Sequence, residues 1–274
     1  MRYSSFKPGD ETKGLSVIFD YSTDDNYANP GRPYLTSNAY KQKVLYTDKR
    51  HNELLMIAPG GSPEGDMPYL SRYDIAKKKN QILWRCATPY YEEFVSMIDP
   101  AKQRFITARQ SVRTPVNYIL HDAKRNREET ITNFPNPYPS LENMKVEKMK
   151  YKRADGLDLT ATLYLPVGYD KSRDGRLPVL MWAYPREYRS ADDAAQVRGS
   201  QYKFTEITYR SPIYWVTRGF AVMESVEMPI VGVNGAEPND DFINQLTMNA
   251  EAAAKAIYDL GIGDTTRLAV GGHS

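Results

Sequence analysis

The chain ends in a serine that follows two glycines and a histidine, Gly271-Gly272-His273-Ser274. In α/β-hydrolases a Gly-x-Ser pattern directly after a buried strand begins the nucleophile elbow, a sharp turn that lifts the serine hydroxyl above the sheet edge. Small residues are needed there because the backbone is strained and closely packed. A bare Gly-x-Ser also arises by chance about once in a chain of this length, as an ordinary turn. The apolar segment before it favours Ser274 as a nucleophile.

A tyrosine at the end of another apolar segment could assist such a serine. Tyr184 follows residues 177–183, which are almost entirely apolar. A phenol donates a hydrogen bond without carrying charge, which suits an oxyanion hole, and in α/β-hydrolases the loop after this strand supplies one such donor. The chain has 21 tyrosines, so a purely structural tyrosine is the alternative. The position of Tyr184, rather than its residue type, makes it a candidate.

Strands and helices alternate in the part of the chain that carries both residues. Continuous apolar segments predict strands buried on both faces, and an Asp-Gly turn at residues 155–156 predicts a hairpin before them. Ser211-Pro212 predicts the start of a short helix, and Asn239 or Asp240 predicts the N-cap of a long helix that ends at Gly261. Its apolar stripe is Ile243, Leu246, Ala250, Ala253, Ile257 and Leu260. The predicted strands are 146–151, 157–165, 177–183, 220–223 and 267–270. This pattern predicts a parallel α/β domain of three layers.

The first half of the chain has a different pattern, with short β-branched or aromatic segments between polar turns. The predicted strands are 15–19, 42–46, 53–58, 70–75, 81–85, 94–98, 104–108, 116–121 and 129–132. Two Asp-to-Lys turns, beginning at Asp74 and Asp122, stand 48 positions apart. That spacing fits one four-stranded blade of a β-propeller. Two unrelated hairpins, or a β-sandwich, would also fit.

A proline-rich segment separates the two halves. Pro135, Pro137 and Pro139 exclude both a helix and a central strand over residues 133–139, so this segment is predicted to be a stiff linker. We therefore predict one domain over residues 1–140 and a second over 141–274.

Composition excludes several classes of function. The 274 residues carry a net charge of +2, which gives no large positive field for nucleic acid. No apolar segment approaches the roughly 18 residues of a membrane helix, and residues 1–7 lack the apolar core of a secretory signal. The single cysteine, Cys86, and three scattered histidines predict neither a disulfide nor a metal site, and no cofactor is indicated. Compartment and oligomeric state are not indicated by the sequence.

Four motifs in this order resemble the prolyl oligopeptidase family of serine peptidases, most of all its glutamyl endopeptidase branch. They are Asn133-Phe134-Pro135-x-Pro137-Tyr138-Pro139, Leu159-Thr160-Ala161-Thr162-Leu163-Tyr164-Leu165-Pro166, Gln196-Val197-Arg198-Gly199-Ser200 and Ala269-Val270-Gly271-Gly272-His273-Ser274. The resemblance implies the last blades of a β-propeller followed by the first part of an α/β-hydrolase domain. It implies a peptide substrate, an acyl-enzyme on Ser274 and an oxyanion donor in Tyr184. The family usually has a glycine within two residues of the tyrosine or histidine at this position, whereas Pro185-Arg186-Glu187 follows Tyr184 here.

The resemblance also implies what the substrate and the catalytic triad require. A glutamyl substrate needs a cation for its carboxylate, for which Arg186 and Arg198 are candidates; the alternative is a solvated charge at each. The family order Ser, Asp, His places the other triad members beyond residue 274, so a polypeptide of these residues alone is expected to be an inactive fragment. His51 and His121 are expected at turns, and His273 is too close to Ser274 to act as its base.

Two other functions fit the same sequence. The protein could be an esterase or an acylaminoacyl peptidase of the same fold. It could instead be a non-catalytic binding protein built on a propeller, with a degenerate hydrolase half.

Overall fold

The computed structural model describes residues 1–9, 14–232 and 236–273, which form two compact units. The N-terminal unit comprises Met1–Pro135 together with a later segment, Gln196–Phe204. The α/β unit comprises Asn136–Ala195 and the described residues from Thr205 onward. Ser274, the predicted nucleophile, lies outside the described residues.

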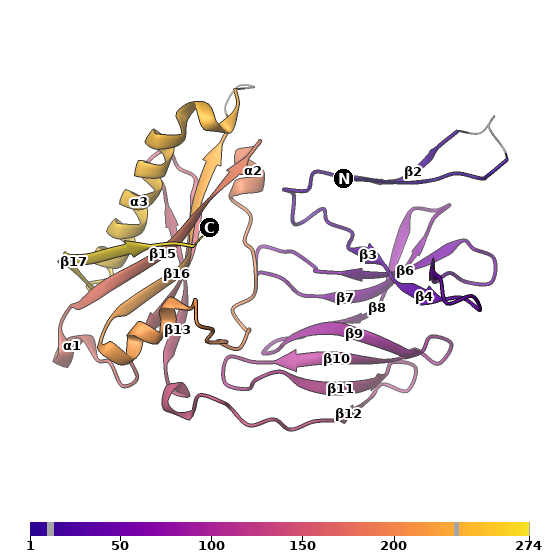
Figure 1. The fold of residues 1–274 in the computed structure, drawn as a ribbon, viewed down its shortest axis with the longest axis horizontal. Helices are drawn as coiled ribbons and strands as arrows, with labels where there is room; N and C mark the ends of the chain where they lie inside the picture. The colour runs from indigo at the N-terminus through magenta and orange to yellow at the C-terminus, as the bar shows by residue number, and fades with distance from the viewer. Residues whose placement is uncertain (10–13, 233–235, 274) are drawn as a thin grey trace. The chain divides into compact units, whose positions relative to one another are not determined.

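The N-terminal unit consists of antiparallel strands, and no helix occurs between residues 40 and 132, all of which are described. Its two larger sheets each have four strands, which are labelled in Figure 1. The first contains β3 (Arg32–Pro33), β6 (Glu53–Ala58), β7 (Tyr69–Asp74) and β8 (Lys79–Arg85). The second contains β9 (Tyr91–Asp99), β10 (Arg104–Gln110), β11 (Asn117–Asp122) and β12 (Arg127–Thr130). Smaller pairs are β1 (Arg2–Ser5) with β2 (Ser16–Asp20), and β4 (Leu35–Ser37) with β5 (Lys43–Leu45). The prediction that short strands build this half is confirmed.

The two Asp-to-Lys turns adopt the same local structure. The Asp74 carboxylate accepts the backbone N–H of Lys77 at 2.9 Å, and Asp122 accepts that of Arg125 at 3.2 Å. The residue after each donor has a positive φ, 51° at Lys78 and 49° at Asn126. Such Asx turns are determined by the local sequence. They connect the third strand to the fourth in each sheet, so the spacing of 48 residues relates equivalent positions of two successive sheets.

An apolar cluster joins the two large sheets. Leu55, Leu70 and Phe105 are buried in it, and Trp84 and Phe94 pack against them. The ring centroids of Trp84 and Phe105 lie 5.8 Å apart in an edge-to-face arrangement, which is favourable for aromatic pairs. This cluster holds the two sheets as one unit.

The α/β unit contains one five-stranded sheet, in the order β13, β14, β16, β15, β17. The strands are β13 (Lys145–Lys152), β14 (Asp158–Leu165), β15 (Leu177–Tyr188), β16 (Ala221–Val231) and β17 (Gly263–Gly271). The strands β16, β15 and β17 are parallel, as predicted for the three strands that alternate with helices. The hairpin of β13 and β14 joins the same sheet through an antiparallel pairing of β14 with β16. A short hairpin turn can connect only antiparallel strands.

Helices cover both faces of this sheet. On one face lies α3 (Phe242–Asp259), which Figure 1 shows beside the sheet. Its Ala253 and Ile257 pack in one buried cluster with Met181 and Met223. On the other, the 3-10 helix η2 (Pro212–Arg218) packs through Ile213 and Val216. The remaining helices are short: η1 (Pro139–Leu141), α1 (Lys171–Asp174), α2 (Ala191–Ala194) and η3 (Pro238–Asp241).

The long helix differs in detail from its prediction. The 3-10 turn η3 contains the predicted caps Asn239 and Asp240, and α3 begins only at Phe242. Ile243 and Leu260, the ends of the predicted apolar stripe, are 74% and 42% exposed. The polar residues Gln245 and Asn249 are buried instead, because they bond the backbone at the end of β16: Gln245 with Val231, and Asn249 with the carbonyl of Pro229. Ser211, predicted to cap the shorter helix, makes no capping hydrogen bond through its side chain.

Candidate active site

The last described residues run along the carboxyl end of β15. Gly271 pairs with Trp182 in the parallel register of β17 and β15. A Cβ added to Gly271 would lie 2.5 Å from the Trp182 ring, and one added to Gly272 would lie 2.5 Å from the carbonyl oxygen of Ala183. Only glycine therefore fits at both positions without a rearrangement. The chain is packed closely against β15 where it approaches Ser274.

Tyr184 lies within a strand rather than on a loop. β15 continues to Tyr188 because β16 pairs with it as far as Val231, so the prediction that the strand ends near Ala183 is wrong. Tyr184 is in register with Glu227 and is 59% exposed. It stands two residues beyond Trp182, the position that pairs with Gly271. Its side chain is therefore accessible, near the point where β17 ends.

A bulge in β16 lies opposite Trp182 and was not predicted. The pairing shifts between Met181 and Ala183 on β15, where Ser225 adopts a left-handed backbone with φ of 52°. A non-glycine residue in that conformation stores strain and often marks a functional region. Burial raises the pKa of the neighbouring Glu224 carboxyl, with a hydrogen bond involving Tyr164 opposing the shift. The sequence signal was this Glu-Ser pair, which interrupts the apolar residues 221–226.

The two candidate arginines lie in different units. Arg186, on β15, is exposed, and its guanidinium lies 5.1 Å from the centroid of the Tyr188 ring. Arg198 lies in Gln196–Phe204 and donates a hydrogen bond to the carbonyl of Asp24 in the N-terminal unit. Its charge also contributes to the lowered pKa of Asp25, after the larger effects of hydrogen bonds from Gln196 and Ala28. Arg198 thus has a structural role. A contact between Arg198 and substrate must therefore be compatible with its hydrogen bond to Asp24.

The segment Gln196–Phe204, which we call the strap, is hydrogen-bonded to the Met1–Pro135 part of the N-terminal unit. The Gln196 side chain accepts the backbone N–H groups of Asn26 and Tyr27 and donates to the Asp25 carboxylate. Farther along, the backbone N–H of Gly199 donates to the Asp66 carboxylate at 3.1 Å, and its carbonyl accepts the Asp66 N–H at 2.7 Å. The sequence contained no local signal for this docking, because every partner lies far away in the chain.

His121 is buried in β11, so its predicted position at a turn is wrong. Its Nε2 lies 2.7 Å from Glu92 Oε1 and 2.8 Å from Thr107 Oγ1. Arg109 donates to the other oxygen of Glu92 at 2.8 Å. Burial would raise the pKa of Glu92, but hydrogen bonds from His121, Thr107 and Arg109 together lower it. His121 therefore belongs to a buried ionic network, whereas His51 does lie at a turn, with φ of 57°.

Within the described ranges, no group of three or more His, Cys, Asp or Glu side chains is placed to hold a metal ion. None of the helices formed by those residues is both long and apolar enough to cross a bilayer.

Comparison with known proteins finds two curated relatives, while none of the protein-family models matches the chain. A probable chloroplastic glutamyl endopeptidase of Oryza sativa is 38% identical over 270 residues, which cover 94% of this chain. Its counterpart in Arabidopsis thaliana is 36% identical over 280 residues, covering 97% of the chain. The chain spans only 29% of the length of each.

Solved structures share the fold at much lower identity. Dipeptidyl peptidase 4 of Porphyromonas gingivalis superposes with a TM-score of 0.56 at 17% identity, covering 94% of this chain and 40% of that one. Oligopeptidase B of Leishmania major gives a TM-score of 0.53 at 13% identity, covering 93% and 33%. A study of two prolyl endopeptidases provides a third match, with a TM-score of 0.50 at 14% identity, covering 95% and 33%. Each match includes strands from both units.

Proposed function

Because the chain belongs to the prolyl oligopeptidase family, we propose that the protein containing it is a serine peptidase that cleaves peptides through an acyl-enzyme on Ser274. In the same proposal residues 1–140 are the last blades of a β-propeller. Residues 141–274 are then the first part of an α/β-hydrolase domain. The two successive four-stranded sheets and the sheet of β13–β17 support this architecture.

The close packing of Gly271 and Gly272 against β15 is the observation that carries the proposal. A nucleophile elbow needs small residues because its backbone turns tightly beside a neighbouring strand. Gly272 meets that need beside the Ala183 carbonyl, two residues before Ser274. An ordinary turn at the end of a strand has no such requirement at successive positions.

The proposed reaction has two steps. The Ser274 oxygen attacks the carbonyl carbon of the substrate, and its proton passes through a general base to the leaving amine as the C–N bond breaks. Water then attacks the resulting ester, which releases the carboxylate product and restores the serine hydroxyl. The family order of the triad puts the base and its acidic partner after Ser274 in the chain.

Tyr184 is proposed to stabilise the oxyanion that forms in both steps. An oxyanion-hole donor must point at the developing negative charge and must not be engaged in another strong hydrogen bond. Tyr184 is exposed near the carboxyl end of the parallel strands, where α/β sheets place their ligands. Arg186 and Arg198 remain the proposed candidates for binding a glutamyl side chain.

The test is fluorophosphonate labelling of the full-length protein, because this probe reacts only with an activated serine. We expect labelling and peptide cleavage in the unmodified protein, and neither in Ser274→Ala. Ser140→Ala is the matched control, since Ser140 is exposed and lies in η1, outside the five-stranded sheet. Labelling that survives Ser274→Ala would refute the nucleophile. If Ser274 is labelled and the protein cleaves esters but not peptides, Ser274 is still the nucleophile, but the protein is not a peptidase.

A further inference from the structure

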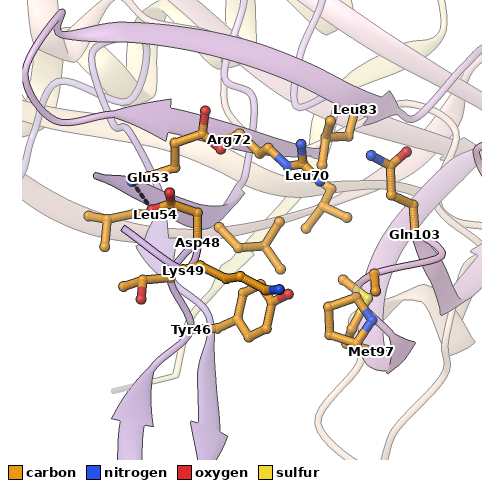
Figure 2. A pocket seen from close by; sticks show the side chains of 14 residues that line it. Tyr46, Asp48, Lys49, Glu53, Leu54, Leu70, Arg72, Leu83, Met97 and Gln103 are labelled. Carbon is orange, nitrogen blue, oxygen red and sulfur yellow. Dashed lines mark hydrogen bonds between the residues drawn. The ribbon is translucent and has the colours of Figure 1, made fainter. Parts of the chain in front are cut away.

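A pocket lies between the two large sheets of the N-terminal unit. Its volume is about 250 Å³, and it is lined by residues of both sheets and of the turn that follows β5. Figure 2 shows Leu70 and Arg72 of β7, with Leu83 of β8, across the pocket from Met97 and Gln103. Leu55 of β6 completes an apolar floor that is continuous with the cluster joining the two sheets. An apolar pocket with a few polar groups at one end is the usual form of a small-molecule site.

Arg72 is the unusual residue in this lining. It pairs with Leu55 in the β6–β7 register, so its side chain emerges among the leucines of the floor, and it is half-buried. Its guanidinium makes no hydrogen bond or ion pair with any residue that the structure describes. A partly desolvated cation without a partner is unfavourable, and a guanidinium binds a carboxylate through two parallel hydrogen bonds. The pocket therefore favours a ligand that brings a carboxylate to Arg72.

The other charged groups at the pocket define the rest of the ligand. Asp48 is occupied, because its carboxylate accepts the backbone N–H groups of Arg50, Asn52 and Glu53 in its own turn. Glu53 has no hydrogen bond or ion pair of its side chain within the described parts of the chain, and in Figure 2 its carboxylate lies at the same end of the pocket as Arg72. Lys49 adds a second positive charge to the lining. Arg72 and Glu53 together offer one charge of each sign, which fits a zwitterion with an apolar body.

We propose that this pocket binds an α-amino acid with an apolar side chain, with its carboxylate on Arg72, its ammonium group on Glu53 and its side chain on the leucine floor. The volume of about 250 Å³ lies at the small end of the range for ligand pockets, which suits a ligand the size of one amino acid. The ligand can be a free amino acid, which carries both charged groups, or a residue at one end of a peptide, which carries only one of them.

The site is independent of the proposed peptidase activity, since every lining residue belongs to the N-terminal unit. Its test therefore uses the full-length protein carrying Ser274→Ala, which keeps amide ligands intact. Binding is measured by isothermal titration calorimetry with leucine, N-acetyl-leucine, leucinamide and glycine. We expect leucine to bind with the highest affinity. N-acetyl-leucine lacks the ammonium group, leucinamide lacks the carboxylate and glycine lacks the apolar side chain, so each should bind at least tenfold more weakly.

Substitutions test which residue binds each charged group of the ligand. Arg72→Gln should weaken leucine binding at least tenfold. Glu53→Gln should weaken leucine but leave N-acetyl-leucine unchanged, because the acetylated ligand has no ammonium group. Arg127→Gln is the control, since Arg127 is exposed on β12 and outside the lining. A normal unfolding temperature for each variant excludes loss of the fold as the cause. Leucinamide binding as tightly as leucine, or unchanged binding in Arg72→Gln, would overturn the assignment. Tight binding of N-acetyl-leucine but not leucine would overturn the role of Glu53 and favour the carboxyl end of a peptide.

Discussion

The side-chain oxygen of Gln196 accepts a hydrogen bond of 2.6 Å from the backbone N–H of Asn26, 170 positions earlier in the chain. Gln196 is only 9% exposed, and its amide nitrogen donates to the Asp25 carboxylate at 2.8 Å. Both ends of one amide are thus satisfied by a single loop of the N-terminal unit. This residue begins the strap, and it ties a segment between α2 and η2 to the loop between β2 and β3.

Replacing Gln196 should therefore loosen the strap. Gln196→Ala leaves the backbone N–H of Asn26 and one Asp25 oxygen without their partner, at a cost of about 1–3 kcal/mol. We expect hydrogen–deuterium exchange at residues 25–27 and 196–199 to rise at least tenfold in the full-length protein. Gln201→Ala is the matched control, because Gln201 lies in the same segment but is exposed. Equal exchange in the two variants would mean that other contacts hold the strap.

The buried network around Glu92 should make the N-terminal unit sensitive to acid. Because the pKa of Glu92 is lowered in the folded state, its stabilising contribution is complete above its unfolded value of about 4.5 and is lost as the pH falls through the folded value. Glu92→Gln should cost about 3 kcal/mol at pH 7 and should flatten the decline in unfolding free energy below pH 4.5. Denaturant unfolding from pH 7 to pH 3 measures both effects.

The control for the acid experiment is Glu129→Gln, since Glu129 is exposed on β12 beside the same network. Its unfolding free energy should match that of the unmodified protein at each pH. An acid-induced decline of the same slope in Glu92→Gln would show that other carboxylates dominate.

Tyr184→Phe removes the proposed oxyanion donor and little else. Loss of one such donor typically lowers kcat by roughly 10²- to 10³-fold. We expect a fall of that order in the full-length protein, with KM nearly unchanged, because the hydrogen bond strengthens only as the oxyanion forms. Tyr209→Phe serves as the control, because Tyr209 is 90% exposed. A kcat within twofold of the unmodified enzyme would remove Tyr184 from the mechanism.

Substrate preference and hydrogen exchange in the strap together distinguish the roles of Arg186 and Arg198. If Arg186 binds a glutamyl side chain, Arg186→Gln should lower the ratio of glutamyl to alanyl kcat/KM at least tenfold, about 1.4 kcal/mol. Arg198→Gln should also raise exchange in the strap, because Arg198 donates to Asp24. Arg218→Gln, an exposed arginine of η2, controls for the loss of charge. An unchanged ratio in both variants would exclude both residues from substrate selection.

Features that depend on neighbours in sequence were predictable. The turns at Asp74 and Asp122 follow from one carboxylate and the next few residues, and so the strands on either side could be located. The apolar periodicity of α3 predicted Ala253 and Ile257 among its buried positions. The pattern before Ser274 placed glycines where a neighbouring strand leaves no room for a side chain.

Tertiary structure alone decided the features that pair distant residues. The local sequence around Gln196 indicates a surface amide, but in the folded chain its side chain accepts a hydrogen bond from the loop at Asn26. The local sequence around His121 indicates a turn, but in the folded chain Glu92 and Thr107 contact its ring. The extension of β15 through Tyr184 depends on how far β16 pairs with it, which no local propensity encodes. Polar side chains such as Gln245 can be buried only because distant backbone groups satisfy them, and those partners exist only in the folded chain.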